Sequence, residues 1–167
     1  MVVPLIWLIA TERMQAAFWL FAAAGASDAV DGFIAKRFNS RTDLGAYLDP
    51  LADKVLLNGV YVATAIVGWL PVWLTFLVIS RDLLIVAGAV LIQRRHPLFR
   101  ARPLLIGKAN TFAQILLAAA VLAHAAGLLD LEEQLAALII TVTATTILSG
   151  AGYMVQAAKA LQAEPRS

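Results

Sequence analysis

The sequence predicts an all-α membrane protein, a polytopic bundle of six transmembrane helices. Composition is the first reason: 61% of the 167 residues are hydrophobic and 14% are charged, against about 25% charged residues in soluble domains. The mean hydropathy of +0.80 agrees with this. The second reason is the pattern, because short charged or proline-containing breaks divide the chain into six apolar stretches.

The six expected helices cover residues 2–10, 14–35, 44–67, 72–92, 104–129 and 135–160. The first is too short to cross a bilayer alone, so we expect it to be truncated, and its flanks do not resemble those of a signal peptide. Each later helix begins after a polar break and is long enough to span the hydrocarbon core. We expect residues 1–167 to form a single membrane-embedded domain. The chain has no cysteines, which excludes disulfides and thiolate metal sites.

The distribution of basic residues predicts the orientation, because cytoplasmic loops retain Lys and Arg. Three regions on one side of the expected bundle carry nearly all of them: Lys36, Arg37 and Arg41; Arg94, Arg95, Arg100, Arg102 and Lys108; and Lys159 and Arg166. The breaks on the opposite side contain one basic residue, Arg13. We therefore expect both termini to be cytoplasmic, with Trp19, Trp69 and Trp73 toward the far interface.

Four carboxylates lie within the second and third expected helices, in the segments Asp28-x2-Asp31-Gly32 and Gly45-x3-Asp49-x3-Asp53. Each Asp at the centre of a membrane helix costs roughly 2.5–3.5 kcal/mol, so a cation must offset the four. Residues three or four apart share a helix face. If the two faces meet, the oxygen ligands suit Mg²⁺ or Mn²⁺. The two glycines leave room for a phosphate or nucleotide near the backbone.

The same residues resemble the signature of the CDP-alcohol phosphatidyltransferases, D-x2-D-G-x2-A-R-x8-G-x3-D-x3-D. Every spacing agrees, and the residues are Asp28, Asp31, Gly32, Ala35, Lys36, Gly45, Asp49 and Asp53. The one departure is Lys36, which stands where the family has Arg. A lysine keeps the charge but lacks the planar fork of arginine for a diphosphate, and the adjacent Arg37 is an alternative contact.

The resemblance implies an integral membrane enzyme whose active site faces the cytoplasm and which transfers a phosphatidyl group from CDP-diacylglycerol to an alcohol, releasing CMP. It implies that Asp28, Asp31 and Asp49 bind the divalent metal and that Asp53 is the catalytic base, with a further metal contact from Asp53 left open. It assigns the nucleotide to Asp28, Gly32, Ala35, Lys36 and Gly45. It also implies a homodimer among membrane lipids.

The acceptor is predicted from the fourth and fifth helices. Arg81 falls near the middle of a membrane helix, where a charge is costly unless it faces an anion or a wet cavity. We interpret Arg81 and Lys108 as acceptor ligands, and the alternative for Arg81 is an ion pair with an Asp inside the bundle. The acceptor contains glycerol, either phosphatidylglycerol or glycerol 3-phosphate. Asn110, in a position where a second cation would suit a phosphate monoester, favours phosphatidylglycerol and hence a cardiolipin synthase.

Simpler interpretations apply to several other residues. Lys54 is expected to extend to the interface or to pair with an Asp. His124 is expected to be a hydrogen-bonded bundle residue, and Ser149-Gly150-Ala151-Gly152 to permit close helix packing or a dimer contact. The basic loop from Arg94 to Lys108 is short and lacks a folded nucleic-acid-binding domain, so it does not predict nucleic-acid binding. The rival functions are a small transporter or ion pathway, since intramembrane carboxylates also mark ion paths, and a catalytically silent family homologue.

Overall fold

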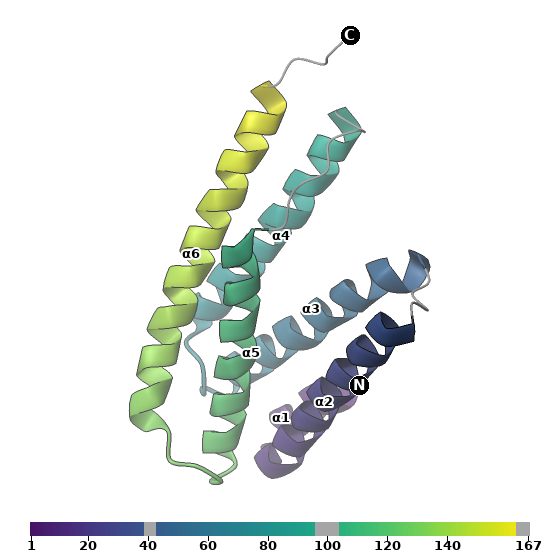
Figure 1. The fold of residues 1–167 in the computed structure, drawn as a ribbon. Helices are drawn as coiled ribbons and strands as arrows, with labels where there is room; N and C mark the ends of the chain where they lie inside the picture. The colour runs from purple at the N-terminus through teal and green to yellow at the C-terminus, as the bar shows by residue number, and fades with distance from the viewer. Residues whose placement is uncertain (39–42, 96–103, 163–167) are drawn as a thin grey trace.

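The structure is a computed structural model that describes the backbone of residues 1–38, 43–95 and 104–162 and the side chains of residues 1–27, 30, 53–89 and 104–159. Within these ranges the chain forms helices only, which confirms the all-α prediction (Figure 1). The helices are α1 (Val2–Ala10), α2 (Met14–Phe38), α3 (Asp43–Ile66), α4 (Val72–Arg95), α5 (Leu105–Ala125) and α6 (Glu132–Gln162).

Three helices are long and apolar enough to cross a membrane, judged over the described residues: α4 over Val72–Ala89, α5 over Leu105–Ala125 and α6 over Glu132–Lys159. The 31 residues of α6 correspond to about 46 Å of helix, more than the hydrocarbon thickness of about 30 Å. The nine residues of α1 correspond to about 14 Å, so α1 is too short to cross alone. These helices make the chain an integral membrane protein.

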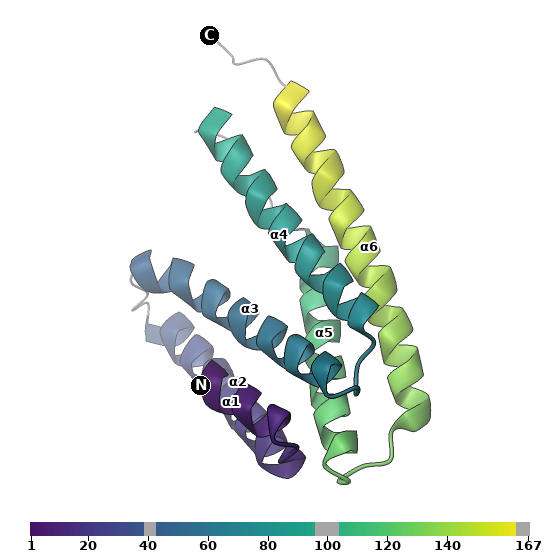
Figure 2. The same ribbon diagram turned by 180° about the vertical axis from the view of Figure 1, so that it is seen from behind.

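The helices pack in two groups that are joined by α3 and by a direct contact between α2 and α5. Helices α4 and α5 each pack against α6, and α1 packs against α2. Figures 1 and 2 show α3 running diagonally between the two groups, and it contacts α1, α4 and α5. The carboxyl ends of α4 and α6 lie at the same end of the molecule (Figures 1 and 2). Helices α4 and α6 therefore run in the same direction.

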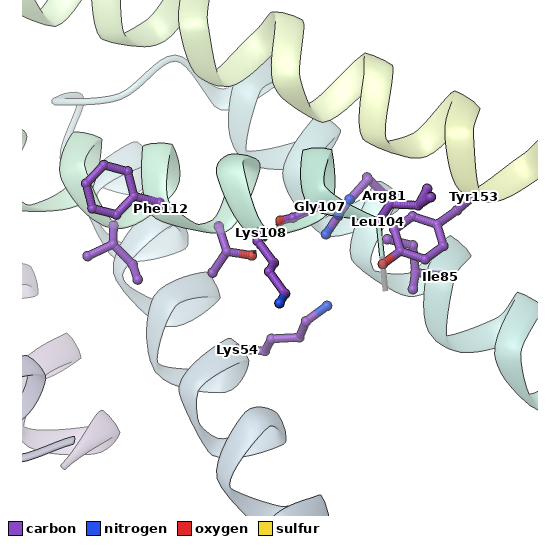
Figure 3. Close-up of a pocket in the computed structure, with 10 residues that line it drawn as sticks. Lys54, Arg81, Ile85, Leu104, Gly107, Lys108, Phe112 and Tyr153 are labelled. Atoms are coloured by element: carbon purple, nitrogen blue, oxygen red, sulfur yellow. Dashed lines mark hydrogen bonds between the residues drawn. The ribbon is translucent and has the colours of Figure 1, made fainter. Parts of the chain in front are cut away.

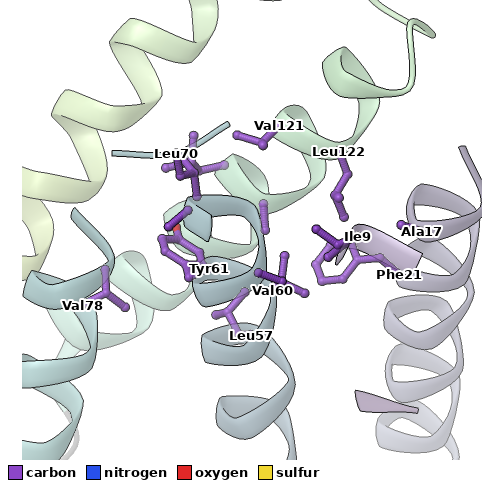
Figure 4. Packing of buried hydrophobic residues seen from close by; sticks show 14 of the residues in the cluster. Ile9, Ala17, Phe21, Leu57, Val60, Tyr61, Leu70, Val78, Val121 and Leu122 are labelled. Atoms are coloured by element: carbon purple, nitrogen blue, oxygen red, sulfur yellow. The ribbon is translucent and has the colours of Figure 1, made fainter. Parts of the chain in front are cut away.

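The core is apolar and is formed where the two groups meet α3. Figure 4 shows Leu57, Val60 and Tyr61 of α3 packed among buried side chains of the neighbouring helices. The other buried members include Leu5, Ile9, Ala17, Phe21, Leu74, Val78, Leu117, Val121, Leu122 and Val142. Large apolar side chains also cover the outer faces, such as Phe76 at 74% and Leu105 at 81% exposure. Exposure of such faces to water would be unfavourable, whereas lipid solvates them.

Glycines end two of the helices at the turns that precede α4 and α6. Gly68 has φ +86° and Gly127 has φ +68°, the left-handed region that favours glycine. After α5, the amide of Gly127 donates to the carbonyl of His124, and the amide of Leu128 to that of Ala123. These bonds satisfy carbonyls that a helix end leaves unpaired. The turns return the chain across the bundle and so bring α6 against α4 and α5.

Candidate active site

The aspartate motif lies on the carboxyl-terminal half of α2 and the amino-terminal half of α3. The side chains of all its members except Asp53 lie outside the described residues, so their predicted convergence stays a prediction; these members are Asp28, Asp31, Gly32, Ala35, Lys36, Gly45 and Asp49. Asp53 is described and exposed, in the third turn of α3. Asp53 is thus the residue of the motif whose side chain can be related to the pocket described next.

The residue after Asp53, Lys54, lines a pocket. The pocket has a volume of about 460 Å³ and lies between α3, α4, α5 and α6 (Figure 3). Its lining residues are Lys54, Arg81, Ile85, Leu104, Gly107, Lys108, Thr111, Phe112, Ile115 and Tyr153. The lining divides into a cationic and hydroxylated part and an apolar part. Such a lining suits an amphipathic molecule with an anionic headgroup.

Three cations of the pocket come from three different helices. Figure 3 shows the side chains of Lys54 on α3 and Lys108 on α5 pointing toward each other across the pocket, with Arg81 of α4 beside them. Both predicted acceptor ligands, Arg81 and Lys108, therefore line the same cavity. Lys108 is exposed, whereas the side chain of Arg81 is 6% exposed. The long lysine stems can adjust to a ligand, and the arginine is fixed by its surroundings.

A buried ion pair fixes Arg81. Nη1 of Arg81 donates to Oδ1 of Asp82 at 2.7 Å, and Nζ of Lys54 donates to the same oxygen at 3.1 Å. The side chain of Asp82 is 10% exposed and that of Lys54 is 32% exposed. The sequence-based alternative for Arg81, an ion pair with an Asp, is thus observed, together with its place on the pocket wall. The expected pairing of Lys54 with an Asp is confirmed too.

The family is decided by comparison with known proteins. A model of the family described as "CDP-alcohol phosphatidyltransferase" matches residues 1–155. This chain belongs to the CDP-alcohol phosphatidyltransferase family. The match extends well beyond the aspartate motif and includes every residue that lines the pocket.

Two kinds of relative are similar to this chain. A "Cardiolipin synthase (CMP-forming)" of Homo sapiens is 38% identical over 133 residues, which are 70% of this chain and 44% of the relative. A chloroplastic "CDP-diacylglycerol–glycerol-3-phosphate 3-phosphatidyltransferase 1" of Oryza sativa subsp. japonica is 37% identical over 166 residues, 88% of this chain and 50% of the relative. A Bacillus subtilis protein of the latter activity is 32% identical over 105 residues, 63% of this chain and 53% of the relative. The chain spans about half the length of these relatives.

The site of this family member includes two residues of α6 that the sequence did not single out as functional. Oγ of Ser149 accepts a hydrogen bond from Nη2 of Arg81, and the Tyr153 ring lies with its centroid 5.7 Å from the Arg81 guanidinium carbon. Ser149 was interpreted only as part of a small-residue packing run. The available signal was their spacing, since residues four apart share one helix face.

Asn110 is not among the residues that line the pocket. Its side chain is fully buried, and its Oδ1 accepts hydrogen bonds from the hydroxyls of Thr145 and Thr146 on α6, each at 2.9 Å. The sequence-based argument for phosphatidylglycerol treated Asn110 as a headgroup contact in place of a cation. The side chain instead joins α5 to α6, so that argument has no structural basis, and the acceptor preference stays open.

His124 fits its expected role in the bundle. Its Nδ1 accepts a hydrogen bond from the amide of Leu131 at 3.2 Å, and its ring packs edge-on against Trp69 with centroids 5.8 Å apart. It lies near the carboxyl end of α5, away from the pocket lining. The interpretation of His124 as a hydrogen-bonded structural residue is therefore confirmed.

Proposed function

We propose that the protein transfers a phosphatidyl group from CDP-diacylglycerol to a hydroxyl of a glycerol-containing acceptor and releases CMP. The observation that carries the proposal is the cationic pocket that starts at Lys54, directly after the last aspartate of the family motif. Relatives named for cardiolipin synthesis and for transfer to glycerol 3-phosphate support the same chemistry with two acceptors. Phosphatidylglycerol and glycerol 3-phosphate are both kept as candidates.

The metal proposed for this reaction is Mg²⁺ or Mn²⁺. Its ligands would be Asp28, Asp31, Asp49 and Asp53, an all-oxygen donor set that suits hard cations. Two observations support this: Asp53 is exposed rather than buried among apolar residues, and the next residue in the chain, Lys54, lines the pocket. When bound, the metal would neutralise the diphosphate and the developing charge on the leaving group.

The remaining roles, binding of the nucleotide and binding of the acceptor, fall to residues of the chain. Lys36, with Gly32, Ala35 and Gly45, would bind the cytidine nucleotide, and Lys108 and Arg81 would hold the anionic group of the acceptor.

Asp53 would take the proton of the acceptor hydroxyl as its oxygen bonds to the lipid-side phosphorus and the bond from that phosphorus to the CMP oxygen breaks. An aspartate is a weak base for an alcohol. Positioning and charge stabilisation therefore supply most of the acceleration.

We also propose the membrane arrangement predicted by charge. In it the single domain has six spans, both termini are cytoplasmic, the active site opens to the cytoplasm and the protein is a homodimer. Helices α4 and α6, which end near Arg95 and Lys159, have their carboxyl ends at the same end of the molecule (Figure 1), in support of this orientation. Trp69 and Trp73, at the opposite turn, are 40% and 54% exposed. Exposed tryptophans are typical of the lipid interface.

The test is CMP release by the purified protein. We expect Mg²⁺ or Mn²⁺ to support release from CDP-diacylglycerol with phosphatidylglycerol or glycerol 3-phosphate, tested side by side. Asp53→Asn should nearly abolish it, and Asp130→Asn, a change at an aspartate whose side chain is 92% exposed on the far turn, should not. No CMP with either acceptor would reject the enzyme in favour of a silent homologue. Metal-dependent ion flux into vesicles without CMP would favour the ion pathway.

A further inference from the structure

We propose that α6 completes the acceptor pocket, with Ser149 as a positioning residue for Arg81 and the Tyr153 hydroxyl as a direct ligand of the acceptor's phosphate. This inference rests on the proposed function and deepens it. It assigns a binding role to the sixth helix, which carries no part of the aspartate motif.

Arg81 is held on three sides, two of which belong to α6. Nη1 donates to Asp82 of its own helix, Nη2 donates to Ser149, and the Tyr153 ring lies beside the guanidinium. A Cβ at Gly150 would lie 3.7 Å from Cγ of Arg81, so the stem of the side chain passes close to α6 at this glycine. Because an arginine loses much rotamer freedom when fixed, a guanidinium held in advance binds an anion at lower entropic cost.

Ser149 differs from the other hydroxyl residues of its helix. Thr141 and Thr143 donate to carbonyls one turn earlier, the usual arrangement for hydroxyls inside a helix, and Thr145 and Thr146 donate to the neutral side chain of Asn110. Ser149 is fully buried and accepts from a charged side chain of another helix. A packing role alone would need only a small side chain such as alanine. The serine oxygen therefore fixes the direction of one N–H edge of Arg81.

The Tyr153 hydroxyl and Nη2 of Arg81 meet over Gly107. A Cβ built on Gly107 would lie 3.2 Å from Oη of Tyr153 and 3.4 Å from Nη2 of Arg81. Because Gly107 has no side chain, the Tyr153 hydroxyl and Nη2 of Arg81 can both lie close to the α5 backbone. Lys108 is the next residue, and Figure 3 shows its ammonium group in the same pocket.

These donors suit a phosphate, and the proposed function attaches that phosphate to glycerol. A phosphate oxygen can accept from the tyrosine hydroxyl, from the guanidinium and from an ammonium group at once. The apolar part of the pocket, Ile85, Leu104, Phe112 and Ile115, would then contact carbon rather than charge. The same phosphate can belong to soluble glycerol 3-phosphate, a monoester, or to the headgroup of phosphatidylglycerol, a diester.

The experiment measures binding as well as turnover. Equilibrium binding of glycerol 3-phosphate and of glycerophosphoglycerol, a soluble diester headgroup, is measured on full-length protein in micelles. We expect Tyr153→Phe, which keeps the ring, to weaken binding of at least one probe about tenfold, the size of a lost hydrogen bond to a charged group. In turnover the acceptor KM should rise by the same factor while the CDP-diacylglycerol KM stays unchanged. The probe with the larger loss identifies the source of the phosphate.

Ser149→Ala should weaken binding about three- to tenfold in the wild-type background and have no effect in an Arg81→Met background, since the serine acts only through Arg81. Ser80→Ala is the matched control, because the Ser80 hydroxyl bonds to the carbonyls of Phe76 and Leu77 on its own helix. Melting temperatures of all variants are compared, so that a folding defect is recognised.

Equal binding of both probes by Tyr153→Phe and wild type would overturn the role of Tyr153. An undiminished effect of Ser149→Ala in the Arg81→Met background would overturn the role of Ser149. Failure of the proposed function is separate: wild type would release no CMP. The inference would then stand if glycerol 3-phosphate still binds with dependence on Tyr153, and fall if it does not.

Discussion

The charge of Asp82 should be the strongest single electrostatic contribution to stability at the pocket. Its Oδ1 accepts from Arg81 at 2.7 Å and from Lys54 at 3.1 Å. Asp82→Ala would leave the Arg81 guanidinium, 6% exposed, without its carboxylate. Breaking a buried pair in this way costs about 3–5 kcal/mol. We therefore expect the melting temperature to fall by about 10 °C, since about 1 kcal/mol corresponds to 2–4 °C at this size.

The two partners of Asp82, Lys54 and Arg81, should contribute unequally to the free energy of unfolding. Lys54 is 32% exposed, and solvent screens its half of the interaction, so Lys54→Met should cost only about 0–1 kcal/mol. Arg81→Met should fall between the two, because Asp82 would keep Lys54 as a partner. The double variant Arg81→Met/Asp82→Leu should recover most of the stability, as apolar replacements of buried pairs often do. It should nevertheless bind glycerol 3-phosphate poorly.

The assay is reversible unfolding in mixed micelles, followed by circular dichroism, with the acceptor KM measured on the same preparations. Equal destabilisation by Asp82→Ala and Lys54→Met would refute the reasoning. The difference in burial between Lys54 and Arg81 would then have no effect on stability. Normal acceptor binding by the stable double variant would show that Arg81 serves only the bundle.

Three further results follow from the geometry. Gly107→Ala should raise the acceptor KM severalfold with little change in melting temperature, because the new Cβ would lie 3.2 Å from the Tyr153 hydroxyl; an unchanged KM would contradict the convergence of donors there. Asn110→Ala should lower the unfolding free energy by about 1–3 kcal/mol, as for a lost buried polar partner, and leave the ratio of rates with the two acceptors unchanged; a changed ratio would return Asn110 to the acceptor site. Chelation by EDTA should abolish CMP release without changing helix content, and added Mg²⁺ or Mn²⁺ should restore it; activity that survives chelation would contradict the metal site.

The helices could be predicted from the sequence because hydropathy and breaks are local properties. All six expected stretches coincide with helices of the described structure, although some ends differ. The second ends at Phe38 rather than residue 35, because Lys36 and Arg37 are good helix formers even though they are not apolar. The sixth begins at Glu132 rather than residue 135, since acidic residues in the first turn are favoured by the helix dipole.

The partners of each polar side chain could not be predicted in the same way. The position of Arg81 in an apolar helix marked it as functional, but its bond to Ser149 joins residues 68 apart in the chain. Only the packing of α4 against α6 brings them together. Asn110 was misplaced for the same reason, since its neighbours Thr145 and Thr146 lie on another helix. The spacing of Tyr153 from Ser149 places both on one helix face, but it does not distinguish a pocket residue from a packing residue.

The charges at the pocket favour an anionic ligand and stabilise the pocket before the ligand arrives. The described residues that line the pocket include three cations, Lys54, Arg81 and Lys108, and no carboxylate. Lys54 and Arg81 share the carboxylate of Asp82. Arg81 is stabilised by Asp82 and α6, whereas the lysines retain mobile stems. An arriving phosphate can then take Lys54 from Asp82 and meet Lys108 without disturbing Arg81, so binding requires rearrangement of the more exposed cations only.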